Sequence, residues 1–155
     1  MCTVPTPHPD FSLTFPPDPA WVRTCRETVR TSTLALKRSE LTELAVLLTS
    51  ESVTNAITAC VDAGCAYPIT LYGEWRAEGP LRIHVRDVAP GMPAVCSPAP
   101  GAVHGRGMQL IAACAACWGI CLDGPGPGKS LWFQMEEPIG GRGPNPTRTG
   151  VLGSR

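Results

Sequence analysis

The chain has 155 residues, with 13 basic and 13 acidic side chains, so its formal net charge is zero. This length suits one domain around one core, and the balanced charge argues against a nucleic-acid-binding surface. The first twenty residues lack the basic start and apolar block of a secretion signal, and no apolar run is long enough to span a membrane. We therefore expect a soluble, cytoplasmic protein.

Eight cysteines are many for this length, and without a secretion signal we expect reduced thiols. Cys114, Cys117 and Cys121 form the tightest cluster. On one continuous helix they would share a face and offer a metal or iron–sulfur site. The alternative, which we favour, is that they are small packing residues. Trp118 and Gly119 are expected to end the helix before Cys121, and no fourth ligand stands nearby.

Both ends of the chain differ in composition from its middle. Six prolines among the first twenty residues exclude a regular helix or a central strand, which predicts an extended or disordered lead-in at residues 1–17. The final residues are rich in glycine, proline and arginine, which predicts a disordered tail at residues 137–155. The folded domain is therefore expected at residues 18–136.

The central feature is a long helix with polar residues on its apolar side. Leu41, Leu44 and Leu48 recur on one face, and the same stripe continues to Glu51 and Asn55. An acid and an amide on the buried side of a helix need a polar partner, and a ligand that carries a cation is our interpretation. The alternative is that Glu51 turns to solvent while Asn55 caps a loop.

Asp87 adds a second polar group. Counting by twos from Leu81 places it on the buried face at the end of its strand, although a strand-end aspartate also commonly turns outward to begin a loop. Residues 88–106 follow, with four prolines and three glycines and no periodicity. A connection this long is typical of a lid over a ligand site.

Two glycine-containing stretches invite comparison with phosphate-binding loops. Gly105, Arg106 and Gly107 precede an apolar helix, where bare backbone N–H groups can approach a phosphate. Residues 128–130, Gly-Lys-Ser, suggest a Walker motif, which we reject. Asp123 stands where that motif needs a glycine, and the chain continues as a strand instead of a helix. The plain interpretation is a flexible hairpin turn.

The expected elements follow one another in a simple order. Helices come first, then a hairpin, the long connection, a third helix and a second hairpin. The expected helices are residues 18–36, 41–61 and 108–117, and the expected strands are residues 69–75, 81–87, 120–122 and 130–135.

Four stretches in this order resemble the ATP-binding anti-sigma-factor serine kinases of the histidine-kinase-like ATPase superfamily, especially the short versions abundant in actinobacteria. LLTSESVTNAI is similar to the family's asparagine box, VRDVAPGMP to its first glycine box, GRGMQLI to its second, and GKSLWF to its closing strand. The resemblance covers residues 18–136. It implies an α+β, two-layer sandwich of the Bergerat type: a mixed, mostly antiparallel sheet has helices on one face, and ATP lies under the lid.

The resemblance also implies roles for individual residues. Asn55 would coordinate Mg²⁺ that bridges the phosphates of ATP, and Glu51 would orient or deprotonate the attacking hydroxyl. Asp87 would accept a hydrogen bond from the adenine amino group, and Ser130 would stand where a threonine assists that contact. Gly105, Arg106 and Gly107 would line the phosphates, and Gly91 of the first glycine box would also belong to the ATP-binding residues.

Three positions depart from the family pattern. Ala89 replaces a glycine of the first glycine box, which leaves open the close backbone approach there. Ala59 stands where many relatives have a histidine, and Ser52 replaces the usual aliphatic residue beside the glutamate. These changes remove none of the implied ATP ligands, but they leave catalytic turnover open.

The sequence is therefore compatible with three functions. The first is a Mg-ATP-dependent serine kinase that phosphorylates an anti-sigma-factor antagonist and alternatively sequesters a sigma factor, without direct contact to nucleic acid or membrane. The second is a catalytically silent regulatory module that binds nucleotide or only a partner. Retained Glu51 favours the first, and the altered glycine box favours the second. The third is a metal protein built on the clustered cysteines. Relatives commonly form homodimers, for which the outer face of the sheet is the expected surface.

Overall fold

The structure is a computed structural model, and it describes residues 10–75, 79–95, 105–122 and 127–136. Most of the expected lead-in, the expected tail and the middle of the expected lid lie outside the described residues. The helices are α1 (Trp21–Ala35), α2 (Ser39–Asp62) and α3 (Gly107–Cys114), and the strands are β1 (Phe11–Phe15), β2 (Ile69–Trp75), β3 (Leu81–Asp87), β4 (Cys117–Cys121) and β5 (Lys129–Met135).

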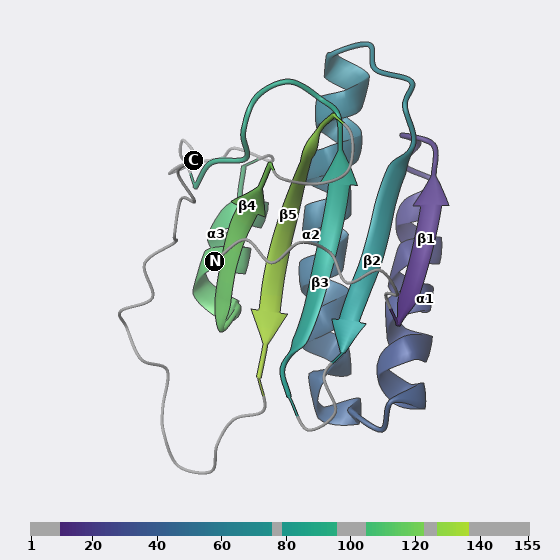
Figure 1. Cartoon of the computed structure of the whole chain (residues 1–155), viewed down its shortest axis with the longest axis vertical. Coiled ribbons are helices and arrows are strands. Elements are labelled where there is room, and N and C mark those ends of the chain that lie inside the picture. Colours follow the sequence, from purple (N-terminus) through teal and green to yellow (C-terminus); the bar gives the residue numbers. More distant parts are fainter. Residues whose placement is uncertain (1–9, 76–78, 96–104, 123–126, 137–155) are drawn as a thin grey trace.

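The five strands form one sheet in the order β1-β2-β3-β5-β4, and each neighbouring pair is antiparallel. Figure 1 shows the three helices together behind this sheet. The α+β class with helices on one face is therefore confirmed, and the arrangement is compatible with two layers. The expectation of a mixed sheet is wrong for the described strands. The connections from β2 to β3 and from β4 to β5 are short, while the segment with α1 and α2 returns β2 antiparallel to β1, and the segment with α3 and β4 returns β5 antiparallel to β3.

Strand β1 lies where the sequence predicted only an extended or disordered lead-in. Phe11 pairs with Gly73 and Phe15 pairs with Ile69, which adds β1 to the edge of the sheet. Prolines flank this strand, and proline is tolerated beside an edge strand although not in a central one. Phe15 is only 2% exposed and belongs to the core. The fold therefore includes residues 10–17, and the predicted domain start at residue 18 is wrong.

The two N-terminal helices are confirmed within a few residues. Before α1, the Asp18 carboxylate accepts a hydrogen bond from the Ala20 amide at 2.8 Å. After α2, Gly64 takes a φ of 64°, a left-handed conformation that commonly ends helices. By length and apolar composition α2 is the one described helix able to cross a membrane, yet half of its apolar window is buried within the fold. This burial is typical of the core helix of a soluble protein.

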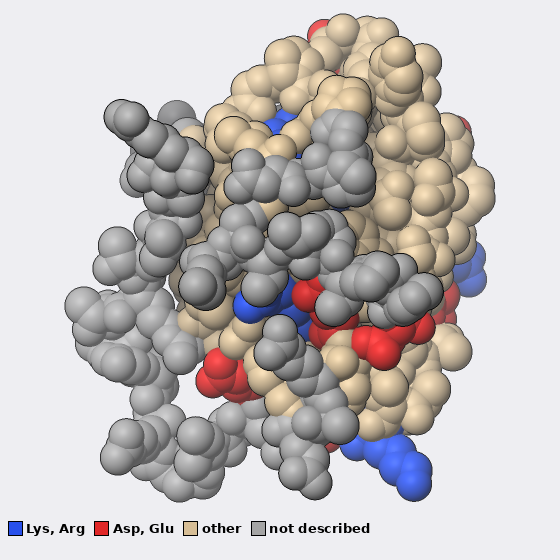
Figure 2. All heavy atoms as spheres, in the orientation of Figure 1, with Lys and Arg blue, Asp and Glu red and all other residues tan. Residues whose placement is uncertain are grey.

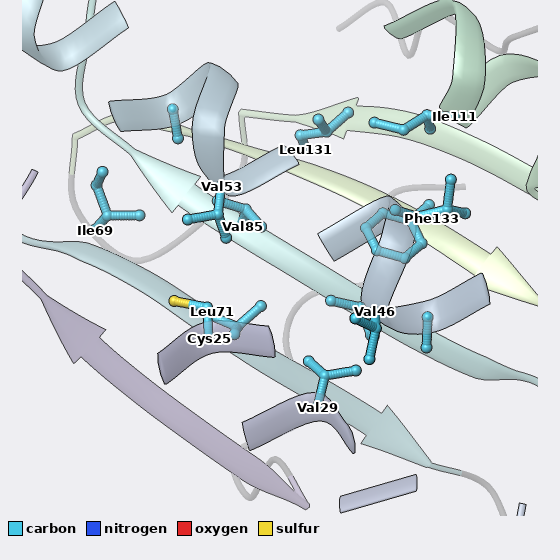
Figure 3. Close-up of a cluster of buried hydrophobic side chains, with 14 of the residues drawn as sticks. Cys25, Val29, Val46, Val53, Ile69, Leu71, Val85, Ile111, Leu131 and Phe133 are labelled. Atoms are coloured by element: carbon cyan, nitrogen blue, oxygen red, sulfur yellow. The ribbon is translucent and has the colours of Figure 1, made fainter. Parts of the chain in front are cut away.

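The hydrophobic core fills the space between the helices and one face of the sheet. In β3, Leu81, Ile83 and Val85 are all at most 1% exposed, and the next residue in this alternating row is Asp87. The row therefore carries a carboxylate to the edge of the core. Figure 3 shows how side chains from all three helices meet those of the strands, among them Cys25, Val29, Val46, Val53, Ile69, Leu71, Val85, Ile111, Leu131 and Phe133.

The helix α3 is shorter than predicted. It ends at Cys114 because Ala115 is extended, with ψ of 146°, and because the Ala116 amide donates to the Gln134 carbonyl of β5 at 2.8 Å. Strand β4 consequently begins at Cys117, three residues before the predicted start at Ile120. The last expected strand is confirmed as β5, which supports rejection of the Walker motif because a strand, not a helix, continues directly from the Gly-Lys-Ser stretch.

The clustered cysteines do not share a helical face. Cys114 ends α3, whereas Cys117 and Cys121 belong to β4, so the geometry required for the metal-binding hypothesis is not formed. Cys121 is disulfide-bonded, which corrects the expectation that all thiols are reduced. Within the described ranges, no three His, Cys, Asp or Glu side chains gather as metal ligands.

Candidate functional site

A cavity of about 590 Å³ lies where β3 ends and β5 begins, against the C-terminal half of α2 and the start of α3. Figure 1 shows the end of β3, the start of β5 and the C-terminal end of α2 together at the top of the view. This volume is in the range of small-molecule sites. The residues that line it include all those proposed from the sequence except Ser130, namely Glu51, Asn55, Asp87, Gly91, Gly105, Arg106 and Gly107.

The helix α2 contributes one polar row to the cavity. Glu51, Asn55, Ala59 and Asp62 all line it, at the spacing of successive helical turns. Glu51 and Asn55 are partly buried, so neither simply turns out to solvent. Ala59 is the one residue of this row without a polar side chain.

The start of α3 packs directly on this row. A Cβ added at Gly107 would lie 2.8 Å from Glu51 Oε2 and 3.2 Å from Asn55 Nδ2, so glycine is what permits the close approach. No side chain caps α3 at Arg106. Because the first amide groups of an α-helix have no acceptor within the helix, the cavity has backbone donors on one side and the acid and amide on the other.

The two other glycines of the cavity are required by backbone conformation. Gly91 has a φ of 85° and Gly105 a φ of 95°, both in the left-handed region. A Cβ at Gly91 would meet nothing within 4 Å, so crowding does not explain the glycine there. The turn itself needs a residue without a side chain.

Asp87 is buried at the inner end of the cavity, with 5% exposure. Its Oδ1 accepts hydrogen bonds from Lys129 Nζ at 2.7 Å and from the Ala89 amide at 2.9 Å. Lys129 Nζ also donates to the Ala89 carbonyl at 2.5 Å. Ala89 does not have a positive φ, since Lys37 is the one non-glycine residue that does among those described. Alanine therefore fits this turn without the strain expected for a replaced glycine.

Lys129, which was not among the residues proposed from the sequence, occupies the place expected for Ser130. In β5, Lys129 and Leu131 line the cavity, while the intervening Ser130 points to the opposite face because side chains alternate along a strand. There the Ser130 hydroxyl lies 3.5 Å from Arg86 Nη1. The prediction that Ser130 assists Asp87 is therefore wrong. Counting by twos from the apolar residues of β5 would have identified the lysine.

The described lining residues carry more acidic than basic side chains, so an anion fits this cavity only together with a cation. Three acids, Glu51, Asp62 and Asp87, face two basic residues, Arg106 and Lys129. Because Lys129 is held by Asp87, Arg106 is the remaining positive side chain. A phosphate accompanied by a divalent cation fits this balance, and the amide oxygen of Asn55 with nearby carboxylates is the oxygen-rich ligand set that Mg²⁺ prefers.

A second polar cluster lies on the opposite face of the sheet, where Figure 2 shows acidic and basic side chains side by side. The His84 ring stacks on Tyr72 at 4.4 Å, and His84 is 3% exposed. Burial lowers the pKa of His84 to about 4, although Glu74 lies 3.5 Å away. His84 is therefore neutral at pH 7. Arg82 stacks over Trp132 at 4.6 Å in the same layer.

The two faces of the sheet thus carry different chemistry. The helix-covered face has the cavity with Glu51, Asn55 and Asp87, and the other has the stacked aromatic and basic side chains.

In comparisons with known proteins, no family model matches the chain and no curated protein matches it.

Proposed function

We propose that the chain is a Mg-ATP-binding regulator of the anti-sigma-factor kinase type, which phosphorylates a serine of an anti-sigma-factor antagonist. The observation that carries this proposal is the convergence of three separate stretches of sequence on one cavity. Glu51 and Asn55 come from α2, Asp87 and Gly91 from the end of β3 and the turn that follows it, and the Gly105–Gly107 stretch from the start of α3. Such convergence supports a ligand site.

The polar groups that line the cavity match the parts of Mg-ATP: the cation, the phosphates and the base. Asn55 would hold Mg²⁺ through its side-chain oxygen, with the excess of carboxylates favouring a cation nearby. The backbone N–H groups at Gly105 and Gly107 would donate hydrogen bonds to the phosphates. Asp87 would accept a hydrogen bond from the amino group of the base. Bound Mg-ATP would supply the phosphoryl group that is transferred.

Glu51 would accept the proton of the incoming serine hydroxyl. It stands one helical turn before Asn55, so both groups face the same side of the cavity. The absent side chain at Gly107 leaves room for the Glu51 carboxylate beside the start of α3. Phosphoryl transfer depends mainly on positioning and charge, and a base aligned with the hydroxyl adds to both.

The proposal includes protein partners and a location. The antagonist would be the substrate, and a sigma factor would be the protein sequestered in the alternative state. We place these encounters in the cytoplasm, without direct contact of the chain with nucleic acid or membrane, and with a homodimer formed through the outer face of the sheet.

A catalytically silent regulatory module is the second candidate. One observation favours it: the Asp87 carboxylate, the expected acceptor for the base, is already bonded to Lys129 and to the Ala89 amide. If this pairing prevents productive nucleotide binding, the chain acts through its protein partners alone.

Transfer of labelled phosphate tests the two candidates. The wild type, Glu51→Gln and Glu43→Gln are incubated with Mg²⁺, γ-labelled ATP and candidate antagonists. Glu43 is an exposed glutamate two turns earlier on α2, with a side chain 80% exposed, and serves as the matched control. We expect transfer by the wild type and Glu43→Gln, and a loss of about 100-fold or more in Glu51→Gln with ATP binding retained. Absence of transfer to any antagonist, with or without nucleotide binding, would instead support the silent module.

A further inference from the structure

The ion pair of Asp87 and Lys129 is part of the wall of the cavity. The two residues face each other across β3 and β5, and both line the cavity. Their side chains are 6% and 7% exposed, so both charges are almost fully removed from water. A buried pair of this kind is costly to desolvate, and replacing it by apolar residues is often no less stable. Stability alone is therefore a weak reason for the pair to lie here.

The hydrogen bonds of the pair leave one acceptor and one donor available. Within the described part of the chain, both bonds to Asp87 end on Oδ1, which leaves Oδ2 as an acceptor. The Lys129 ammonium has three N–H groups, of which Asp87 and the Ala89 carbonyl take two. The third is a charged donor at the lining of the cavity, next to the spare carboxylate oxygen.

We propose that Lys129 is a second base-recognition residue, which acts together with Asp87. This inference rests on the proposed function. Asp87 Oδ2 accepts a hydrogen bond from the exocyclic amino group of adenine, and the third N–H of Lys129 donates to the neighbouring ring nitrogen, N1. An acceptor beside a donor complements this edge of adenine, where a donor stands beside an acceptor.

A purely structural Lys129 makes a different prediction. If it only balances the charge of Asp87, the protein should not distinguish ATP from an analogue that lacks the N1 acceptor. If it donates to N1, removal of that one ring nitrogen breaks a charge-assisted hydrogen bond and leaves a buried donor unsatisfied. The affinity should then fall by about 10- to 100-fold.

The experiment compares nucleotides on the wild-type protein, so it does not depend on a variant that folds. Mg-ATP, Mg-1-deaza-ATP, Mg-7-deaza-ATP and Mg-GTP are titrated calorimetrically. We expect 1-deaza-ATP to bind about 10- to 100-fold more weakly than ATP, and 7-deaza-ATP, which changes the other edge of the base, to bind like ATP. In Lys129→Met, the difference between ATP and 1-deaza-ATP should disappear.

The contrary outcomes separate the two proposals. Equal affinities of wild type for ATP and 1-deaza-ATP, or an undiminished difference in folded Lys129→Met, would overturn the role of Lys129 and leave ATP binding intact. Tighter binding of GTP than of ATP would show that the pair recognises the reversed donor and acceptor of guanine, and the adenine assignment would be wrong. Absence of ATP binding by the folded wild type would overturn the proposed function together with this inference.

Discussion

Lys129 Nζ lies 2.7 Å from Oδ1 of Asp87, and the pair joins the first residue of β5 to the last residue of β3 inside a ligand-sized cavity. A carboxylate that ends a buried apolar row is thereby held beside the only lysine of the described cavity wall. This relationship ties the stability of the sheet to the chemistry of the site.

The first prediction concerns the cost of breaking this pair. Lys129→Met should lower the free energy of unfolding by about 3–5 kcal/mol, because it leaves the Asp87 charge buried without its partner. The double variant Asp87→Asn, Lys129→Met should recover part of the loss, since neither charge remains. Urea unfolding measures both effects. Lys37→Met, at an exposed lysine, is the control, with an expected change within about 0.5 kcal/mol. If Lys129→Met changed the free energy of unfolding as little as Lys37→Met does, the pair would not be desolvated.

The second prediction concerns the contact of α3 with α2. Gly107→Ala should cost less than about 1 kcal/mol of stability, because the added Cβ meets mainly the ends of the Glu51 and Asn55 side chains. Displacing these groups should weaken Mg-ATP binding by about tenfold or more. Gly64→Ala is the control, since a φ of 64° makes alanine strained there while Gly64 lies outside the cavity lining. Wild-type affinity in Gly107→Ala would contradict the proposed placement of the phosphates.

The third prediction concerns pH. Burial lowers the pKa of His84 from 6.5 to about 4, so between these values the unfolded chain binds a proton that the folded protein does not. Stability should therefore fall as the pH is lowered through this window, by about 3 kcal/mol in total from His84. Urea unfolding at pH 7 and pH 4 measures the loss. His84→Phe, which keeps a ring against Tyr72, should lose less over the same range. Equal losses in the two proteins would show that His84 is not buried as a neutral side chain.

The fourth prediction concerns the edge strand. Phe15→Ala should reduce the free energy of unfolding by about 3–5 kcal/mol, because Phe15 is 2% exposed within the core. Ser12→Ala, on the exposed face of the same strand, should change it by less than about 0.5 kcal/mol. Similar small effects of both substitutions would restore the view that β1 is only a lead-in.

The parts of the fold that could be predicted are those with a clear local period. The leucine stripe of α2 continues to Glu51 and Asn55, and the alternation of β3 leads to Asp87, so simple counting placed these residues on the side where the cavity lies. Gly107 was proposed for its bare backbone, and the structure adds that its missing Cβ admits the Glu51 and Asn55 side chains.

The remaining parts depend on contacts between distant segments. Strand β1 exists because Phe15 pairs with Ile69 and packs into the core, a gain that its proline-rich surroundings do not reveal. The end of α3 is fixed by the bond from Ala116 to the Gln134 carbonyl of β5. Lys129 was overlooked because a charged residue at a strand start resembles a turn residue, and only its partner Asp87 explains why it is buried.

A calorimetric titration of Mg-ATP into the wild type, Asn55→Ala and Ser50→Ala tests the nucleotide site most directly. Asn55 lines the cavity, whereas Ser50 lies five residues earlier on α2 and does not. We expect saturable binding by the wild type and Ser50→Ala, and at least about tenfold weaker binding by Asn55→Ala. No saturable binding by a folded wild-type protein would contradict the nucleotide site on which the proposed kinase activity depends.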